Sequence, residues 1–361
     1  MITQWEGTNE YFAESPQHSL LVFYDDDPLT GGTEIFRLTD QTMIGSAVID
    51  YASTALDSLE IGTTIATEFD ASIFYDNVPT GTRLGDKWVW VYSSVDMENW
   101  NSHGIFWIDG NPKYKNVISI TGLDHFIKMD AEIPLAELKT WVGDGKTPQQ
   151  YFEYICTQCG VTGVYTSGAN STALLSAPEE QGMTYRQLLG WVLGIMGRVG
   201  YVDNYGVIRC RYPERIKKTA VVGQAIVGLA VVGRNGDSPQ PYDITFDLTD
   251  RFNSEYEDDI SITGVSVTDY EGNITVYGGS GHTYDMSYNP FIDRDTEGGI
   301  YAYVKGVTYA PMTMETVPCP WITPLDWVRY IDKDGDYHYG VVTNATHCIN
   351  GHSHIECRGT L

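Results

Sequence analysis

The stretch MTYRQLLGWVLGIMGRVGYVDNYGVIRCR (residues 183–211) decides the fold, because it holds a helix signal and a hairpin signal in immediate succession. Thr184 followed by Gln187 is a pattern that starts helices. Apolar residues then recur at helical spacing as far as Val199, and a glycine comes next. The turn at 204–206 separates two short strand patterns. The stretch therefore predicts a helix that ends near Val199, followed by a hairpin.

A second helix is predicted upstream, in KTPQQYFEYICTQCG (146–160). Thr147 is a good N-cap, and Gln150 completes a capping box with it. Cys156 and Cys159 fall on the apolar stripe of this helix. We interpret both thiols as core residues, because no second CxxC pair completes a zinc site and no βαβ pattern supports a redox motif.

The rest of the chain has the texture of a β protein, with 37 Gly, 25 Tyr, 11 Phe and 9 Trp among 361 residues. Strand patterns lie at 71–77, 87–94, 103–110 and 116–124, and hairpin patterns at 260–279 and 326–347. We expect a mainly β fold with an α/β segment. The predicted domains are a first β domain (1–135), a small helix-helix-hairpin domain (136–211) and a second β domain (212–361).

The charge of the chain argues against nucleic-acid binding. With 22 Lys+Arg against 48 Asp+Glu, the formal charge is −26, and the densest basic run is confined to 215–218. MITQWEGTNEYF (1–12) has no signal-peptide pattern, and six scattered cysteines do not form a disulfide framework. The apolar stretch 219–233 is shorter than a membrane span and is broken by glycine, so we expect buried strands there rather than a membrane segment.

The segment THCINGHSHIEC (346–357) raises the question of a metal site. A two-residue turn at Asn-Gly would pair His347 with His354, which would put His347, His352 and His354 on one strand face and Cys348 and Cys357 on the other. The five residues then cannot form a single site. Three histidines on one face could still bind a divalent metal, although an ordinary surface hairpin is the preferred interpretation.

No catalytic site can be assigned from the sequence. Asp332, Asp334 and Asp336 resemble part of a calcium loop, but the EF-hand glycine and glutamate are missing. Asp124-His125 could be an acid/base pair at a strand end, although polar residues are common there. The nucleophile-elbow, zinc-protease, P-loop and dinucleotide motifs do not occur. We therefore predict a protein that is not an enzyme, with no cofactor and no catalytic, cofactor-binding or metal residues.

The order of these segments resembles that of hub proteins of phage tails and baseplates. The resemblance is carried by HGIFWIDGNPKYKNVISITGLDHFIKMD (103–130), TPQQYFEYICTQCGVT (147–162), the stretch 183–211, DDISITGVSV (258–267), the Gly278-Gly279 pair, the Asn289-Pro290 step, and DKDGDYHYGVVTNATHCINGHSHIECRG (332–359). It runs from about residue 45 to the end. The apolar segment 219–233 departs from the family pattern, and we assign it no role.

The resemblance implies a homotrimer with two tail-tube-like β-barrel domains per chain, so that three chains imitate a six-fold ring. Such a hub adapts the hexameric tail tube to a trimeric spike or cap and surrounds the DNA channel. The implied partners are the tail tube or distal tail protein, the central spike or cap protein, the tape measure protein and other baseplate proteins. The implied location is the tail tip or baseplate of a virion made in the bacterial cytoplasm, of a tailocin or of another contractile injection system.

The acidic composition agrees with this resemblance, because a channel that passes DNA should not retain it. Two alternatives remain open from the sequence. One is a cell-wall or glycan hydrolase that uses two carboxylates, which a zymogram would detect. The other is a carbohydrate-binding adhesion module, suggested by the Tyr and Trp content, which a glycan array would detect.

Overall fold

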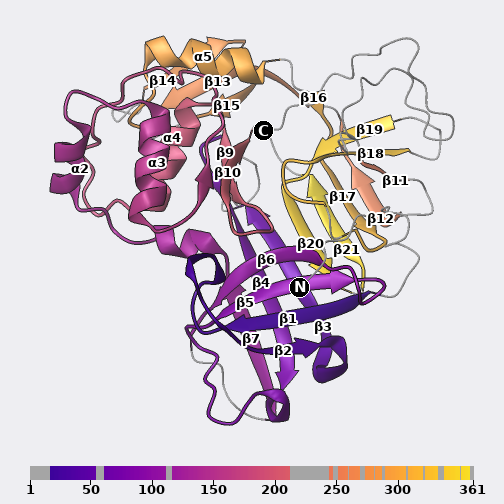
Figure 1. The fold of residues 1–361 in the computed structure, drawn as a ribbon. Helices are drawn as coiled ribbons and strands as arrows, with labels where there is room; N and C mark the ends of the chain where they lie inside the picture. Colours follow the sequence, from indigo (N-terminus) through magenta and orange to yellow (C-terminus); the bar gives the residue numbers. More distant parts are fainter. Residues whose placement is uncertain are drawn as a thin grey trace, which may run out of the picture.

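We describe the fold from a computed structural model (Figure 1). It describes residues 17–53, 61–110, 116–211, 244–246, 251–258, 260–268, 273–279, 281–286, 289–305, 308–319, 322–331, 337–349 and 351–357. The predicted apolar segment 219–233 and the aspartates at 332, 334 and 336 lie outside these ranges. The fold is mainly β, as the sequence predicts.

The N-terminal part is antiparallel β structure connected by short 3-10 turns. Its strands are β1 (His18–Tyr24), β2 (Glu34–Thr39), β3 (Met43–Ser53), β4 (Thr64–Phe74), β5 (Trp88–Ser94), β6 (Asn101–Ile108) and β7 (Val117–Leu123). Its 3-10 helices are η1 (Pro28–Thr30), η2 (Asp40–Thr42), η3 (Tyr75–Asn77) and η4 (His125–Met129). The four strands predicted between 71 and 124 are confirmed in β4 to β7.

The central part holds the predicted helices and hairpin. Its elements are α2 (Leu135–Val142), α3 (Pro148–Gln158), β8 (Gly163–Val164), α4 (Tyr185–Ile195), β9 (Val199–Val202) and β10 (Ile208–Arg211). The Thr147 capping box is confirmed, and the hairpin of β9 and β10 forms around the predicted turn. One prediction is wrong: α4 ends at Ile195 instead of continuing to Val199. Gly197, with a φ of 66°, leaves the helix, and Val199 already belongs to β9.

The C-terminal part is again β structure with one helix in the described ranges. Its elements are β11 (Ile244–Phe246), β12 (Arg251–Tyr256), β13 (Ile260–Thr268), β14 (Ile274–Gly278), β15 (His282–Asp285), α5 (Arg294–Val304), β16 (Thr308–Tyr309), β17 (Met312–Thr316), β18 (Trp327–Ile331), β19 (Tyr337–Val341), β20 (Asn344–Cys348) and β21 (Ser353–Cys357). The two hairpins predicted at 260–279 and 326–347 are confirmed by β13 with β14 and by β18 with β19.

Strands from the two ends of the chain belong to one sheet, which we call the joined sheet. Its main path is β12-β17-β21-β20-β3-β4-β7-β6-β5-β1-β2, and β20 pairs with β3 at the junction (Figure 1). One hydrophobic core under the sheet combines Ile49 and Phe69 with Ile355. The sheet therefore depends on contacts between residues about 300 positions apart in the sequence, such as Thr346 with Asp50.

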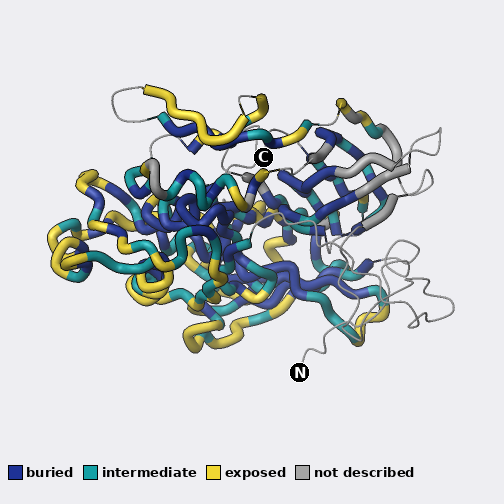
Figure 2. The backbone as a smooth tube through the Cα atoms, turned by 90° about the horizontal axis from the view of Figure 1, so that it is seen from above, coloured by how far each residue is buried: buried dark blue, intermediate teal, exposed yellow. Residues whose placement is uncertain are grey.

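Two further large cores lie outside the joined sheet, and a small cluster of Leu20, Val22 and Tyr92 packs on the opposite side of β1 and β5 from the first core. The helices α2, α3 and α4 pack around a core that includes Tyr151, Leu188 and Phe291. A third core lies among β13, β15 and α5. Buried positions run through the middle of these layers and exposed positions lie mostly toward the outside (Figure 2). Among the described residues, no helix is both long and apolar enough to cross a membrane.

Candidate functional site

One face of the joined sheet carries a row of polar residues that crosses five strands. The row runs through Glu315 on β17, His354 on β21, Thr346 on β20, Asp50 on β3 and Glu68 on β4, each paired directly with the next. Directly paired residues share a face of a sheet, so all five project to the same side. Two residues after Glu68 on β4, Asp70 pairs with Thr121 of β7 and extends the polar surface. We call this side of β17, β21, β20, β3, β4 and β7 the acidic face.

The acidic face is open, whereas the opposite side of the same strands is core. Glu68 and Asp70 are exposed, and Glu315 and His354 keep side-chain exposures of 37% and 35%. Between the two acids of β4, Phe69 is 0% exposed and belongs to the hydrophobic core. The strict alternation of β4 thus gives one buried and one solvated side, as expected of an antiparallel sheet.

Carboxylates dominate the charge of this face. The six strands that form it contain Asp50, Glu68, Asp70, Glu315 and Glu356 but no lysine or arginine. Neighbouring carboxylates on a sheet repel one another, and on these strands only a protonated His354 would offset part of that repulsion. The potential in front of the face is therefore negative.

Hydrogen bonds from neighbouring strands hold several of these carboxylates in place. The Thr346 hydroxyl donates to Asp50 at 2.9 Å, and the Thr121 hydroxyl donates to Asp70 at 2.6 Å. His354 lies between two carboxylates, 2.8 Å from Glu315 and 3.1 Å from Glu356. Partial burial acts to lower the pKa of His354, but the two carboxylates outweigh it and raise this pKa.

The predicted register of the C-terminal hairpin is wrong by one residue. His347 pairs with Ser353, and His354 pairs with Thr346, because the backbone closes with Gly351 N–H on the Cys348 carbonyl instead of through a two-residue turn. Because side chains alternate, the shift puts His347 in the core while His354 lies on the acidic face.

The register also moves the two hairpin cysteines to opposite faces, with Cys357 buried in the core. Both are free thiols. No group of three or more His, Cys, Asp or Glu side chains with metal-binding geometry occurs in the part of the chain that the structure describes. The three-histidine face that the sequence suggested for His347, His352 and His354 is therefore not formed.

Two serine–histidine contacts lie inside the molecule, and neither could be predicted from the sequence. Ser93 Oγ is 2.7 Å from His103 Nε2, and Ser353 Oγ is 2.9 Å from His347 Nδ1. Burial lowers the pKa of His103 to about 3 and that of His347 to about 4, so both rings are neutral at physiological pH. All four side chains are at most 2% exposed, so substrate cannot reach these contacts. We assign them to packing.

Asp124 and His125 do not act as a pair. Asp124 caps η4 by accepting the Phe126 backbone N–H at 2.8 Å, and burial raises its pKa to about 6. His125 Nε2 lies instead 3.2 Å from Asp27 Oδ2. Burial would raise the pKa of Asp27, but hydrogen bonds from His125 and Lys128 lower it. Asp124 thus holds the start of η4 at the end of β7, whereas His125 connects η4 to Asp27 at the start of η1.

Cys156 occupies the core, while Cys159 is half-buried at the end of α3. Burial raises the pKa of both thiols to about 12, which opposes metal binding and redox chemistry, since both require a thiolate. The acidic face is the candidate functional feature that the structure brings together. Sequence reasoning missed it, because the pairing of β20 with β3 cannot be read from either segment alone.

The comparisons with known proteins concern the fold. No protein-family model matches the sequence, and neither does any curated protein sequence. Solved structures of tail proteins are similar to this chain over 93% to 95% of its length. The 43 kDa tail protein of prophage MuSo2 from Shewanella oneidensis has 10% identity and a TM-score of 0.53, with 94% of this chain and 98% of that one covered.

Two further tail proteins give the same result. The tail protein from Neisseria meningitidis MC58 has 12% identity and a TM-score of 0.53, covering 95% of this chain and 96% of that one. The prophage tail protein gp18 from Listeria monocytogenes EGD-e has 9% identity and a TM-score of 0.51, covering 93% and 94%. The chain therefore has the fold of phage tail proteins over nearly its full length.

Proposed function

We propose that this protein is a structural hub of a phage tail tip or baseplate, or of a related contractile injection particle. In this role three copies form a ring around the channel and adapt the hexameric tail tube to a trimeric spike or cap. The partners are the tube or distal tail protein, the spike or cap protein, the tape measure protein and other baseplate proteins. The location is the tail tip or baseplate of the particle.

The observation that supports this proposal best is the acidic face within a tail-protein fold. A surface that lines a DNA channel should repel phosphate groups, because every lysine or arginine contact would retain the DNA. The acidic face meets this requirement over six strands without a lysine or arginine. We therefore propose that the acidic face lines the channel of the trimer.

The proposed three-domain division fits this arrangement. The first domain (1–135) and the second β domain (212–361) each contribute strands to the joined sheet, so one chain would supply two neighbouring segments of the ring wall. In this arrangement the helix-helix-hairpin domain (136–211) lies beside the wall. Each β domain would be one tube-like unit, so that three chains with two such units each would imitate a six-fold ring.

Two measurements test the hub role itself. Light scattering of the purified protein should give three times the chain mass of 40.3 kDa. Immunogold labelling of tail-like particles from the producing culture should place antibody against this chain at the distal tail tip. Intact tails without label, in a preparation where an antibody against the tube protein labels disrupted tails, would refute the proposal.

Charge reversal tests the channel assignment separately. The double substitution Glu68→Lys and Asp70→Lys puts two basic side chains on the acidic face, and we expect particles that assemble but eject their DNA slowly. The matched control is Glu137→Lys with Glu153→Lys, which makes the same change in net charge on exposed positions of α2 and α3. Equal ejection rates in the two variants would show that the acidic face is not the channel wall.

A further inference from the structure

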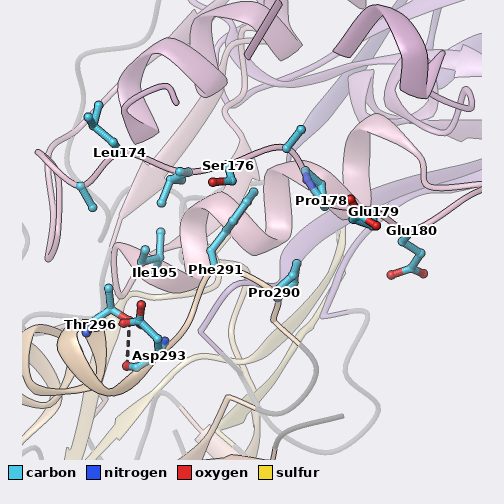
Figure 3. Close-up of a pocket in the computed structure, with 13 residues that line it drawn as sticks. Leu174, Ser176, Pro178, Glu179, Glu180, Ile195, Pro290, Phe291, Asp293 and Thr296 are labelled. Atoms are coloured by element: carbon cyan, nitrogen blue, oxygen red, sulfur yellow. Dashed lines mark hydrogen bonds between the residues drawn. The ribbon is translucent and has the colours of Figure 1, made fainter. Parts of the chain in front are cut away.

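A groove of about 940 Å³ lies on the helical side of the molecule (Figure 3). No residue of the acidic face is among those that line it. One wall is the loop 173–180, and the other is the segment 290–296, which leads into α5. Ile195, at the end of α4, lies between them. The volume is at the upper end of what small-molecule sites occupy, so the groove has room for a short stretch of polypeptide.

The floor of the groove is apolar and firmly held. Leu175 is 5% exposed, Ile195 is 0% exposed and Phe291 is 8% exposed. The Phe291 ring packs against Tyr151 at 5.5 Å between centroids, and Tyr151 donates a hydrogen bond from its hydroxyl to the Ser176 carbonyl on the opposite wall. The two walls are therefore connected through a buried aromatic residue, which makes the groove a preformed feature.

The rim combines an exposed apolar side chain with carboxylates. Leu174 is 69% exposed and adds apolar surface next to the buried floor. Glu179, Glu180 and Asp293 also line the groove, and no lysine or arginine is among the lining residues. The rim is thus negative and the floor is apolar.

The existing contacts of Glu179 and Glu180 leave the charge of these two carboxylates largely uncompensated. Glu179 is 3.5 Å from Lys139, but the pair is solvated, with a side-chain exposure of 91% at Glu179. Glu180 accepts a hydrogen bond from the Gln187 amide, which is neutral. Asp293 accepts the Thr296 backbone N–H at 3.0 Å at the start of α5 (Figure 3).

We propose that this groove binds a segment of a partner protein in which apolar side chains alternate with lysine or arginine. The apolar side chains fill the floor over Phe291 and cover Leu174, and the basic side chains pair with Glu179 and Glu180 at the rim. A nucleic acid does not fit, because its phosphates would face the carboxylates of Glu179 and Glu180. The inference goes beyond the hub role and does not depend on it, because the groove and the acidic face are different surfaces.

The test uses two synthetic fluorescein-labelled peptides and the full-length protein. One peptide alternates leucine with lysine, and the other alternates leucine with glutamate. Fluorescence anisotropy should show binding of the lysine peptide and binding at least about tenfold weaker for the glutamate peptide, because attraction at the rim becomes repulsion. Binding of the lysine peptide should weaken with added salt. Equal affinity for the two peptides, or no binding of the lysine peptide, would overturn the proposal.

Three variants separate the groove from general attraction to an acidic protein. Glu179→Gln with Glu180→Gln, and separately Leu174→Asp, should each weaken binding of the lysine peptide about tenfold. Both sites are exposed, so circular dichroism should show intact folding. The control is Glu68→Gln with Asp70→Asn on the acidic face, which removes the same charge and should leave the affinity unchanged. If the control weakens binding as much as the rim variant, the peptide binds by general charge attraction and the proposal fails.

Discussion

Replacing His347 by glutamine should make the folded protein markedly less sensitive to acid. The side chain is 1% exposed, its Nδ1 is 2.9 Å from the Ser353 hydroxyl, and its Nε2 is 2.6 Å from the Ile322 carbonyl. The carbonyl can only accept, so Nε2 carries the proton and Nδ1 accepts from the serine. Burial lowers the pKa of His347 to about 4, so the ring remains neutral in the folded protein down to that pH.

The size of the effect follows from proton linkage. A histidine in the unfolded chain titrates at about pH 6.5, so at about pH 5 the unfolded chain binds a proton that the folded chain does not. Stability is therefore intact above pH 6.5 and is lost progressively as the pH falls toward 4. Between pH 7 and pH 5 the loss from this one residue is about 2 kcal/mol in the free energy of unfolding. Glutamine cannot titrate, so the variant lacks this loss.

Urea unfolding at pH 7 and at pH 5, at one protein concentration, measures the effect. The drop in unfolding free energy between the two values should be smaller by about 2 kcal/mol in His347→Gln than in the natural protein. Any cost of the substitution that is independent of pH cancels, because each protein is compared with itself. His282→Gln, at an exposed position of β15, should show the natural drop. A natural drop in His347→Gln as well would mean that His347 is charged or accessible in the folded state, which would refute the reasoning.

Three other substitutions or treatments test single structural features. Thr147→Ala removes the capping box of α3 and should lower the unfolding free energy by about 1 kcal/mol, as measured by urea unfolding. Gly206→Ala should lower the unfolding free energy more than Gly182→Ala in the same assay. Both glycines have a positive φ, but only at Gly206 would an added Cβ lie 2.6 Å from the His125 ring. Equal decreases in the two variants would contradict this packing. Cys156 is buried with its pKa raised to about 12, so iodoacetamide at neutral pH should label it only after unfolding, as mass spectrometry of its peptide can show.

Local signals in the sequence predict the local structure well. The start of α3 at Thr147 follows from a cap, a reciprocal side chain and an apolar stripe that all agree, and each acts within one turn of helix. The hairpins of β9 with β10 and of β13 with β14 likewise depend on turn residues next to the strands they join. Such features form from neighbours in the chain, so neighbours suffice to predict them.

The two wrong predictions, the end of α4 and the register of the C-terminal hairpin, depend on tertiary contacts that a local sequence pattern does not contain. The apolar pattern of α4 continues in the sequence from Ile195 to Val199, but Val199 belongs to strand β9. The helix ends because the backbone at Gly197 has a positive φ. An Asn-Gly turn predicts a hairpin at 350–351 correctly but leaves its register open by one residue. A one-residue uncertainty is enough to exchange the two faces of a strand.

The pairing of β20 with β3 explains the register that the C-terminal hairpin adopts in the joined sheet. In this register His347 lies beside Ile49 in the core, and Thr346 lies beside Asp50 on the acidic face. A slip of β3 by one residue would turn Asp50 into the hydrophobic core and Ile49 into solvent, which combines the burial of an unpaired carboxylate with the exposure of a large apolar side chain. The acidic face and the neutral buried histidine are thus two consequences of one register. A sheet face built in this way keeps its negative surface as long as the core beneath it remains packed.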